Sequence, residues 1–199
     1  CSCRDTTSPG SGKEESELLR VTEILKDYVD LSMVPPDVLQ AAAERGTLVH
    51  DICAGILQGF FPPEIQEEAK GYVDSFLIFK EKYIRDVIAV EAEVVHPQWR
   101  YVGHIDFGGY LTMFEAAVVL DWKTPISYSR SWSGQLAGYL EATAKTFPDH
   151  KWAHAGTLQL DPKGRVPKMV WVEQPAAAFH AFTCKLTADN YFRNGGRKS

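Results

Sequence analysis

The chain has 199 residues, of which 45% are hydrophobic and 24% charged, a composition typical of a globular domain and not of a disordered chain. No apolar run approaches the roughly 18 residues that a membrane-spanning helix needs, and the N-terminal residues form no apolar stretch of the secretory type, so we expect no membrane partner. The net charge of −5 argues mildly against a nucleic-acid partner, because phosphate binding usually needs a basic surface.

The N-terminal third of the sequence predicts a tail and three helices. Residues 1–15 are rich in Ser, Gly, Pro and charge, which predicts a flexible tail ahead of a single domain over 16–199. Apolar residues then recur at helical spacing in three segments that prolines separate. These segments run from Ser16 to about Tyr28, from Pro36 to about Gly59, and from Pro62-Pro63 through Phe79.

From residue 87 the apolar residues become β-branched and alternate with polar ones, as they do in strands. Strands are predicted at about 87–96, 101–111, 116–122, 153–160 and 166–172, with helices at about 131–147 and after Pro175. The apolar run at 116–120 is continuous, which is typical of a strand buried on both faces. The element order predicts an α/β fold.

An acid and a base close the third predicted strand. Alternation places Asp121 and Lys123 on the same face, where burial of their charges is costly unless both have partners. Asp106, on the preceding strand, can lie beside Asp121 if the two strands pair, and neighbouring carboxylates repel unless a proton or a metal separates them. Because Mg²⁺ prefers oxygen ligands, the sequence predicts a metal site at this strand end.

Such a site suits the hydrolysis of a phosphodiester. One or two metal ions can lower the pKa of a bound water and neutralise the charge that grows on the phosphate. Lys123 would stabilise that charge or orient the attacking water.

Four motifs in this order resemble the PD-(D/E)XK nuclease superfamily in its RecB-like, phage-type exonuclease branch. They are Gly46…His50 on a predicted helix, Gly103…Asp106 and Asp121-Trp122-Lys123 on predicted strands, and Gln135…Tyr139 on the following helix. The resemblance spans roughly residues 20–190 and rests on the order of the motifs, since each alone is common by chance. It implies a restriction-endonuclease-like core, in which helices flank a central mixed five-stranded sheet and N-terminal helices precede it.

The resemblance also implies a role for each matching residue. Asp106, Asp121, His50 and the backbone carbonyl of Trp122 would be metal ligands, and Lys123 the catalytic lysine. Gln135 and Tyr139, four residues apart on one helix face, would support the catalytic site or contact DNA. The expected cofactor is one or two Mg²⁺ or Mn²⁺ ions, and an imidazole ligand suits Mn²⁺ better.

Several assignments stay open. Glu93 on the first strand resembles an acid often found there and is a further candidate ligand, but Glu91 lies on the same face and the sequence does not choose between them. Arg130 and Ser131, in the polar segment 127–131, are candidates for DNA phosphate binding and equally for ordinary helix capping. His104 is interpreted as structural.

Some relatives in this branch carry an iron–sulfur cluster held by cysteines near the C-terminus. Of the four cysteines here, Cys184 stands alone in that region, so we expect no such cluster.

The leading hypothesis is therefore a metal-dependent DNA nuclease, an exonuclease of phage or recombination type in the cytoplasm of a bacterial or phage-infected cell. It would act alone, as a homo-oligomer or with a separate recombination protein. One alternative is a non-catalytic module that keeps the fold to bind DNA or protein, and a weaker one is cleavage of another substrate such as RNA.

Overall fold

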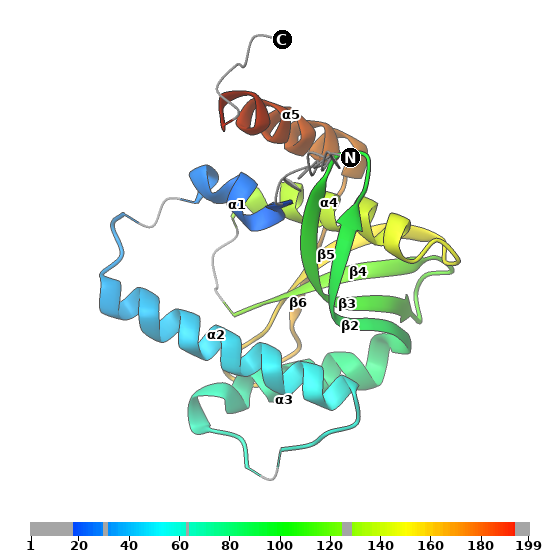
Figure 1. Ribbon diagram of the computed structural model, residues 1–199. Helices are drawn as coiled ribbons and strands as arrows, with labels where there is room; N and C mark the ends of the chain where they lie inside the picture. The colour runs from blue at the N-terminus through cyan, green and yellow to red at the C-terminus, as the bar shows by residue number, and fades with distance from the viewer. Residues whose placement is uncertain (1–17, 30–31, 63, 125–128, 194–199) are drawn as a thin grey trace, which may run out of the picture.

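The computed structural model describes residues 18–29, 32–62, 64–124 and 129–193, so the predicted tail over 1–15 lies outside the described residues. A mixed β-sheet forms the middle layer of the domain, and helices cover both of its faces (Figure 1). The predicted α/β fold, a mixed sheet flanked by helices, is confirmed.

The described elements follow the chain in an order close to the predicted one. They are β1 (Leu19–Arg20), α1 (Val21–Leu25), the 3₁₀ turn η1 (Lys26–Tyr28), α2 (Pro36–Leu57), α3 (Glu67–Tyr83), β2 (Ile84–His96), β3 (Tyr101–Leu111), β4 (Ala117–Lys123), α4 (Ser131–Thr146), β5 (Trp152–Gln159), β6 (Lys168–Trp171) and α5 (Pro175–Arg193).

Two of the N-terminal predictions need correction. Of the helix expected from Ser16 to Tyr28, the described residues 19–28 form a two-residue strand, a five-residue helix and a 3₁₀ turn, because β1 pairs with β3 instead of joining a helix. The third helix begins at Glu67 instead of at the prolines, since Gln66 ahead of it is extended. Glu67 and Glu68 then occupy the first turn, where acids stabilise the amino end of a helix.

The sheet contains the five predicted strands, to which the described residues add the short β1, and β3 pairs with three of the others. Its order is β1-β3-β4-β5-β6, and β2 also pairs with β3. The β2–β3, β3–β4 and β5–β6 pairs are antiparallel, whereas β4–β5 and β1–β3 are parallel. Because β2 runs along the whole of β3, β1 and β4 share the other edge of β3, at Tyr101–Val102 and Phe107–Gly109 respectively.

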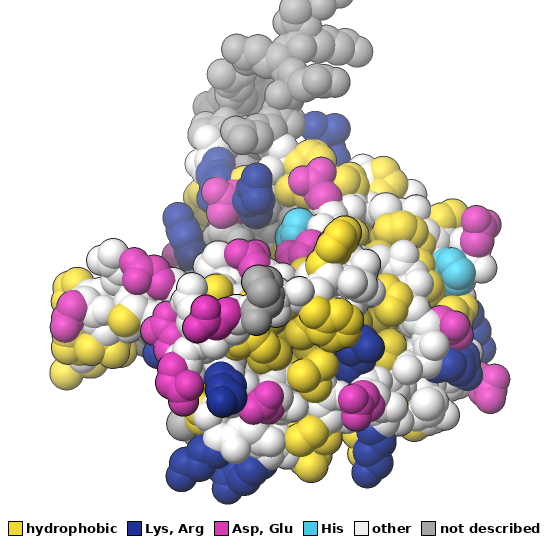
Figure 2. Space-filling view, turned by 90° about the horizontal axis from the view of Figure 1, so that it is seen from below, with side chains coloured by type: hydrophobic (Ala, Val, Ile, Leu, Met, Phe, Trp, Pro, Cys, Tyr) yellow, Lys and Arg dark blue, Asp and Glu magenta, His cyan; other side chains and the backbone are white. Residues whose placement is uncertain are grey.

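Each face of the sheet packs on its own hydrophobic core. On one face α1, α4 and α5 bury residues such as Ile24, Leu136 and Phe182. On the other face α2 and α3 bury Phe76 and Val49, together with inward residues of β3, β4 and β5. Viewed from below, the α2 and α3 side carries acidic and basic side chains interspersed with hydrophobic ones (Figure 2).

Tyr101 joins β3 to α4. Its ring is fully buried and its hydroxyl donates a 2.7 Å hydrogen bond to the carbonyl of Gly138. Burial, with a smaller contribution from the charge of Glu141, raises the pKa of Tyr101 well above its ordinary value, so the phenol stays protonated in the folded protein. Among the helices in the described part of the chain, none is both long and apolar enough to cross a membrane.

Candidate metal centre

The candidate site lies where β3 and β4 separate. Their ladder pairs Phe107 with Leu120 and then stops, although β4 continues to Lys123 alongside β5. At this point the Asp106 side chain replaces the backbone as the hydrogen-bond acceptor, and its Oδ2 accepts a 2.6 Å hydrogen bond from the amide of Trp122. The separation leaves room for side chains between two strands that are otherwise buried.

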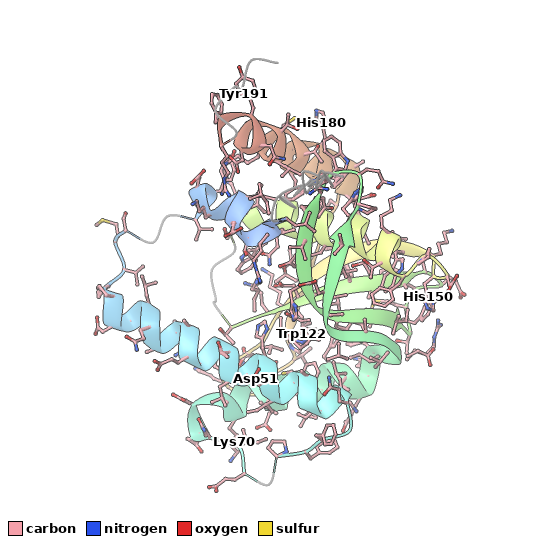
Figure 3. The ribbon with its side chains drawn as sticks, in the orientation of Figure 1. Asp51, Lys70, Trp122, His150, His180 and Tyr191 are labelled. Carbon is pink, nitrogen blue, oxygen red and sulfur yellow. The ribbon has the colours of Figure 1, made fainter. Side chains whose placement is uncertain are left out.

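His50 approaches this gap from α2. Its Nε2 lies 3.0 Å from the Trp122 carbonyl oxygen and its Nδ1 lies 3.3 Å from Asp106 Oδ1. The labelled Trp122 lies between α2 and the sheet in Figure 3, near the part of α2 that carries Asp51. Burial alone would lower the pKa of His50, but the hydrogen bond and charge of Asp106 outweigh burial and raise the pKa to about 9.

Glu91 enters the same space from β2. The register pairs Val90 with Phe107 and Ala92 with Ile105, which places Glu91 opposite Asp106. Its φ is +46°, in the left-handed region that non-glycine residues seldom adopt, and such strain concentrates at functional sites. Burial, and then the charge of Asp106, raises the pKa of the Glu91 carboxyl, while His104 opposes the shift.

These three side chains form a potential metal-binding group. One ligand atom from each of His50, Glu91 and Asp106 lies within 4.8 Å of the other two. Glu91 Oε1 is buried and has no hydrogen-bond partner among the described residues, so it is an uncompensated acceptor that a cation would satisfy. Carboxylate oxygens, an imidazole and a nearby carbonyl are a donor set that suits Mg²⁺ or Mn²⁺, and the residues present therefore fit the ion.

A second group of side chains borders the first through Asp121, which is almost fully buried on β4. Its Oδ2 lies 2.5 Å from Lys123 Nζ, and its Oδ1 accepts a 3.1 Å hydrogen bond from Gln135 Nε2. The same Gln135 nitrogen donates a 3.0 Å bond to the hydroxyl of Tyr139, so α4 holds the carboxylate through two linked side chains.

The electrostatics of this pair keep the lysine charged. Burial by itself would lower the pKa of Lys123, but the adjacent Asp121 carboxylate more than compensates and the pKa rises. For Asp121, burial raises the pKa, and the Lys123 ammonium offsets part of that rise. A buried, charged lysine beside acids is suited to contact an anionic substrate oxygen.

The structure brings most of the sequence-predicted residues together. His50, Asp106, Asp121, the Trp122 carbonyl, Lys123, Gln135 and Tyr139 are joined by the contacts above.

Glu93 is not part of the potential metal-binding group, and Glu91 stands in the place considered for it. Glu93 instead pairs across the strands with His104 and lines a cavity of about 70 Å³ with Arg20 and Tyr139. The strand register is the physical reason, since it places Glu91 opposite Asp106 and Glu93 opposite His104, a difference that the alternation within β2 does not reveal.

Arg130 and Ser131 lie apart from the acidic group. They line a separate cavity of about 300 Å³ between α1, α4 and α5, whose walls include Tyr28 and Phe182. The Ser131 hydroxyl lies 2.7 Å from that of Ser129, and Arg130 makes no capping hydrogen bond at the start of α4. Residues 127 and 128 of the predicted polar segment are outside the described residues.

His104 is the residue that sequence reasoning missed. Its Nε2 lies 2.8 Å from Glu91 Oε2, so it touches the potential metal-binding group directly. The signal was available, because His104 and Asp106 are two residues apart on one strand and therefore share a face.

The mixed sheet and its two helical layers define an α/β domain with a group of acids where β3 and β4 separate. The chain is similar in fold to a solved structure of a proposed exonuclease from Eubacterium rectale, with a TM-score of 0.58 and 12% sequence identity over 97% of this chain and 89% of that one. At this identity the similarity shows the fold. No family model and no curated protein sequence matches the chain at a significant level.

Proposed function

We propose that this protein is a metal-dependent nuclease that hydrolyses phosphodiester bonds in DNA, and that it acts as an exonuclease of the RecB-like branch. The observation that carries the proposal is the convergence of His50, Glu91 and Asp106 within 4.8 Å, with an unpartnered buried oxygen on Glu91. The ordered motifs and the fold shared with a proposed exonuclease support it.

The position of each residue in the site suggests its role. Glu91, Asp106 and His50 would hold a Mg²⁺ or Mn²⁺ ion, and Asp121 and the Trp122 carbonyl remain further candidate ligands. When bound, the ion supplies a Lewis acid and a water of lowered pKa. Lys123 contributes a fixed positive charge at the place where the phosphate gains negative charge, and Asp121 holds the lysine there. Gln135 and Tyr139 fix the orientation of Asp121 from α4.

His50 must release a proton before it can act as a ligand. In the protein without metal, Asp106 holds its imidazole in the charged form, with a pKa of about 9. A cation between the two side chains would replace that proton as the partner of Asp106.

The test of the proposal is a cleavage assay on labelled linear duplex, circular duplex and single-stranded DNA, and on RNA, with Mg²⁺, Mn²⁺ or EDTA. We expect metal-dependent cleavage that requires a DNA end. Lys123→Ala should lower the rate by about 10²–10³-fold, the usual loss when one charge-stabilising donor is removed. Near-normal cleavage by Lys123→Ala would remove the role assigned to the lysine.

Two acids on the same strand provide a matched comparison. Glu91→Gln should abolish cleavage and weaken metal binding, whereas Glu93→Gln should leave both close to wild type, because only Glu91 belongs to the metal-binding group. The reverse result would return the role to Glu93.

The other hypotheses predict different outcomes of the same assay. A non-catalytic module would bind DNA without cutting any substrate, and cleavage confined to RNA would favour the third hypothesis. Assembly into an oligomer and a recombination partner are further proposals, which sedimentation of the purified chain with and without DNA would address.

A further inference from the structure

Glu91 occupies a position that needs a stabilising partner. This carboxylate sits next to Asp106 in a partly buried space, and its backbone is in the left-handed region, so neither its surroundings nor its local conformation favours the position it takes. A side chain in such a position needs a partner on one of its two oxygens if the other is to stay directed at a cation.

His104 is that partner. The backbone register pairs it with Glu93, but its ring reaches diagonally to Glu91, a contact that neighbouring strands commonly allow. Its Nε2 lies 2.8 Å from Glu91 Oε2, while Oε1 remains buried without a partner among the described residues. The two oxygens of one carboxylate are therefore divided between a neighbouring imidazole and the metal-binding space.

We propose that His104 is a positioning residue, which holds Oε2 of Glu91 through its Nε2–H so that Oε1 is directed at the metal ion. The inference rests on the proposed metal centre but assigns a role that the motifs do not contain. Outer partners of this kind fix the orientation of carboxylate ligands, and their loss typically costs 10–100-fold in metal affinity.

The arrangement separates a positioning role from direct ligation. Nε2 faces Glu91, so His104 acts through the glutamate and not on the ion. The half-exposed ring leaves the site open to solvent on that side, and substitution of His104 should not disturb the buried core.

The experiment measures Mn²⁺ binding, by electron paramagnetic resonance of the free ion, alongside the metal dependence of cleavage. The variants are His104→Ala, His104→Gln and, as a matched control, His180→Ala on α5, a histidine on the far side of α4 from the candidate site (Figure 3). Thermal unfolding of each variant establishes that it is folded.

We expect His104→Ala to weaken Mn²⁺ binding by about 10–100-fold and to require correspondingly more metal for cleavage, with most of the rate recovered at saturating metal. His104→Gln should restore most of the affinity, because its amide nitrogen lies about as far along the side chain as Nε2 and can donate the same bond. His180→Ala should bind Mn²⁺ as the wild type does.

A double substitution tests whether His104 acts through Glu91. In a Glu91→Gln background, His104→Ala should cause little further loss of Mn²⁺ affinity, because residues that act through one another are not additive. Full additivity of the two losses would overturn the proposal. So would unchanged Mn²⁺ affinity in His104→Ala, or a loss that His104→Gln does not restore, which would instead favour direct ligation.

The outcomes for this inference and for the nuclease proposal are distinguishable. Wild-type protein that binds Mn²⁺ but cleaves nothing would overturn the nuclease proposal alone and leave the role of His104 measurable by binding. Wild-type protein that binds no Mn²⁺ would overturn the metal centre and this inference with it.

Discussion

Gly103 sits on β3 against the ring of Tyr139, and the substitution Gly103→Ala should damage the site without touching any of the residues proposed to bind metal. A Cβ at Gly103 would lie 2.6 Å from Tyr139 Cδ1 and 2.8 Å from Cε1, with Val94 Cγ2 at 3.3 Å on another side. Carbon atoms pack best at about 3.5–4.0 Å, so the ring would have to retreat by about 1 Å. Tyr139 is only 3% exposed and has no solvent into which to move.

Two effects of different kind follow from this displacement. Overpacking of a well-filled core costs about 1–3 kcal/mol, which for a domain of this size lowers the melting temperature by about 2–12 °C. The moved hydroxyl of Tyr139 also leaves Gln135, which orients Asp121. A misplacement of about 1 Å in a catalytic array can cost about 10²-fold in rate, and we expect a loss of that order in metal-dependent cleavage.

Thermal unfolding by circular dichroism and the metal-dependent cleavage assay measure the two effects separately. Gly134→Ala on α4 is the matched control, because its new Cβ would meet Leu25 at an ordinary 3.6 Å and alanine favours a helix. If Gly103→Ala melts at the wild-type temperature, the packing argument fails. If it melts lower but cleaves normally, the chain from Tyr139 through Gln135 to Asp121 does not matter for catalysis.

Three further predictions concern other parts of the molecule. Gly71→Ala on α3 would place a Cβ 1.9 Å from the backbone carbonyl oxygen of Pro162, which cannot rotate away. This substitution should lower the melting temperature by more than Gly103→Ala does. An equal or smaller effect in thermal unfolding would contradict this contact. Tyr101→Phe removes the buried hydrogen bond to Gly138 and should cost about 0.5–1.5 kcal/mol at neutral pH in a denaturant titration. Because the pKa of Tyr101 is raised on folding, the stability linked to its proton is fully present below the ordinary tyrosine pKa of about 10 and is lost as the pH rises beyond it. The stability advantage of the wild type over Tyr101→Phe should therefore shrink above about pH 10. A constant difference would refute the assignment. Mn²⁺ at about 100 times its dissociation constant should stabilise the wild type by about 2.7 kcal/mol in thermal unfolding and should have no such effect on Asp106→Asn; equal stabilisation of both proteins would place the ion elsewhere.

Most of the fold could be predicted from the spacing of apolar residues. The bounds predicted for β3 agree with the structure, and those for β4, α4 and β5 differ by a residue or so, because buried strands and amphipathic helices carry strong periodic patterns. The region before Tyr28 could not be predicted in the same way, since β1 exists only through its pairing with β3, a long-range contact that leaves no local pattern.

The candidate site also has residues that the sequence could place and one choice that it could not make. Asp121, Lys123, Gln135 and Tyr139 could be placed together because two periodicities, that of a strand and that of a helix, fix their faces. The choice of Glu91 over Glu93 could not be made, because both lie on one strand face and only the pairing with β3 places Glu91 opposite Asp106. The register between two strands depends on long-range pairing, which alternation within one strand does not fix. The left-handed backbone of Glu91 is a separate feature, and strained positions tend to occur in functional sites.

The hydrogen bond from the Trp122 amide to Asp106 has a consequence for how relatives of this protein should be compared. One oxygen of this carboxylate replaces a rung of the ladder between β3 and β4, so the aspartate stabilises the sheet whether or not the protein cuts nucleic acid. A descendant that lost catalysis would still be under selection to keep Asp106. Glu91 replaces no rung of the sheet, and its Oε1 has no hydrogen-bond partner among the described residues, so that oxygen costs stability in the absence of a cation. Under the proposed function, Glu91 is therefore the more informative marker of an active enzyme, and its loss would be an early sign that a copy of this fold has turned to binding alone.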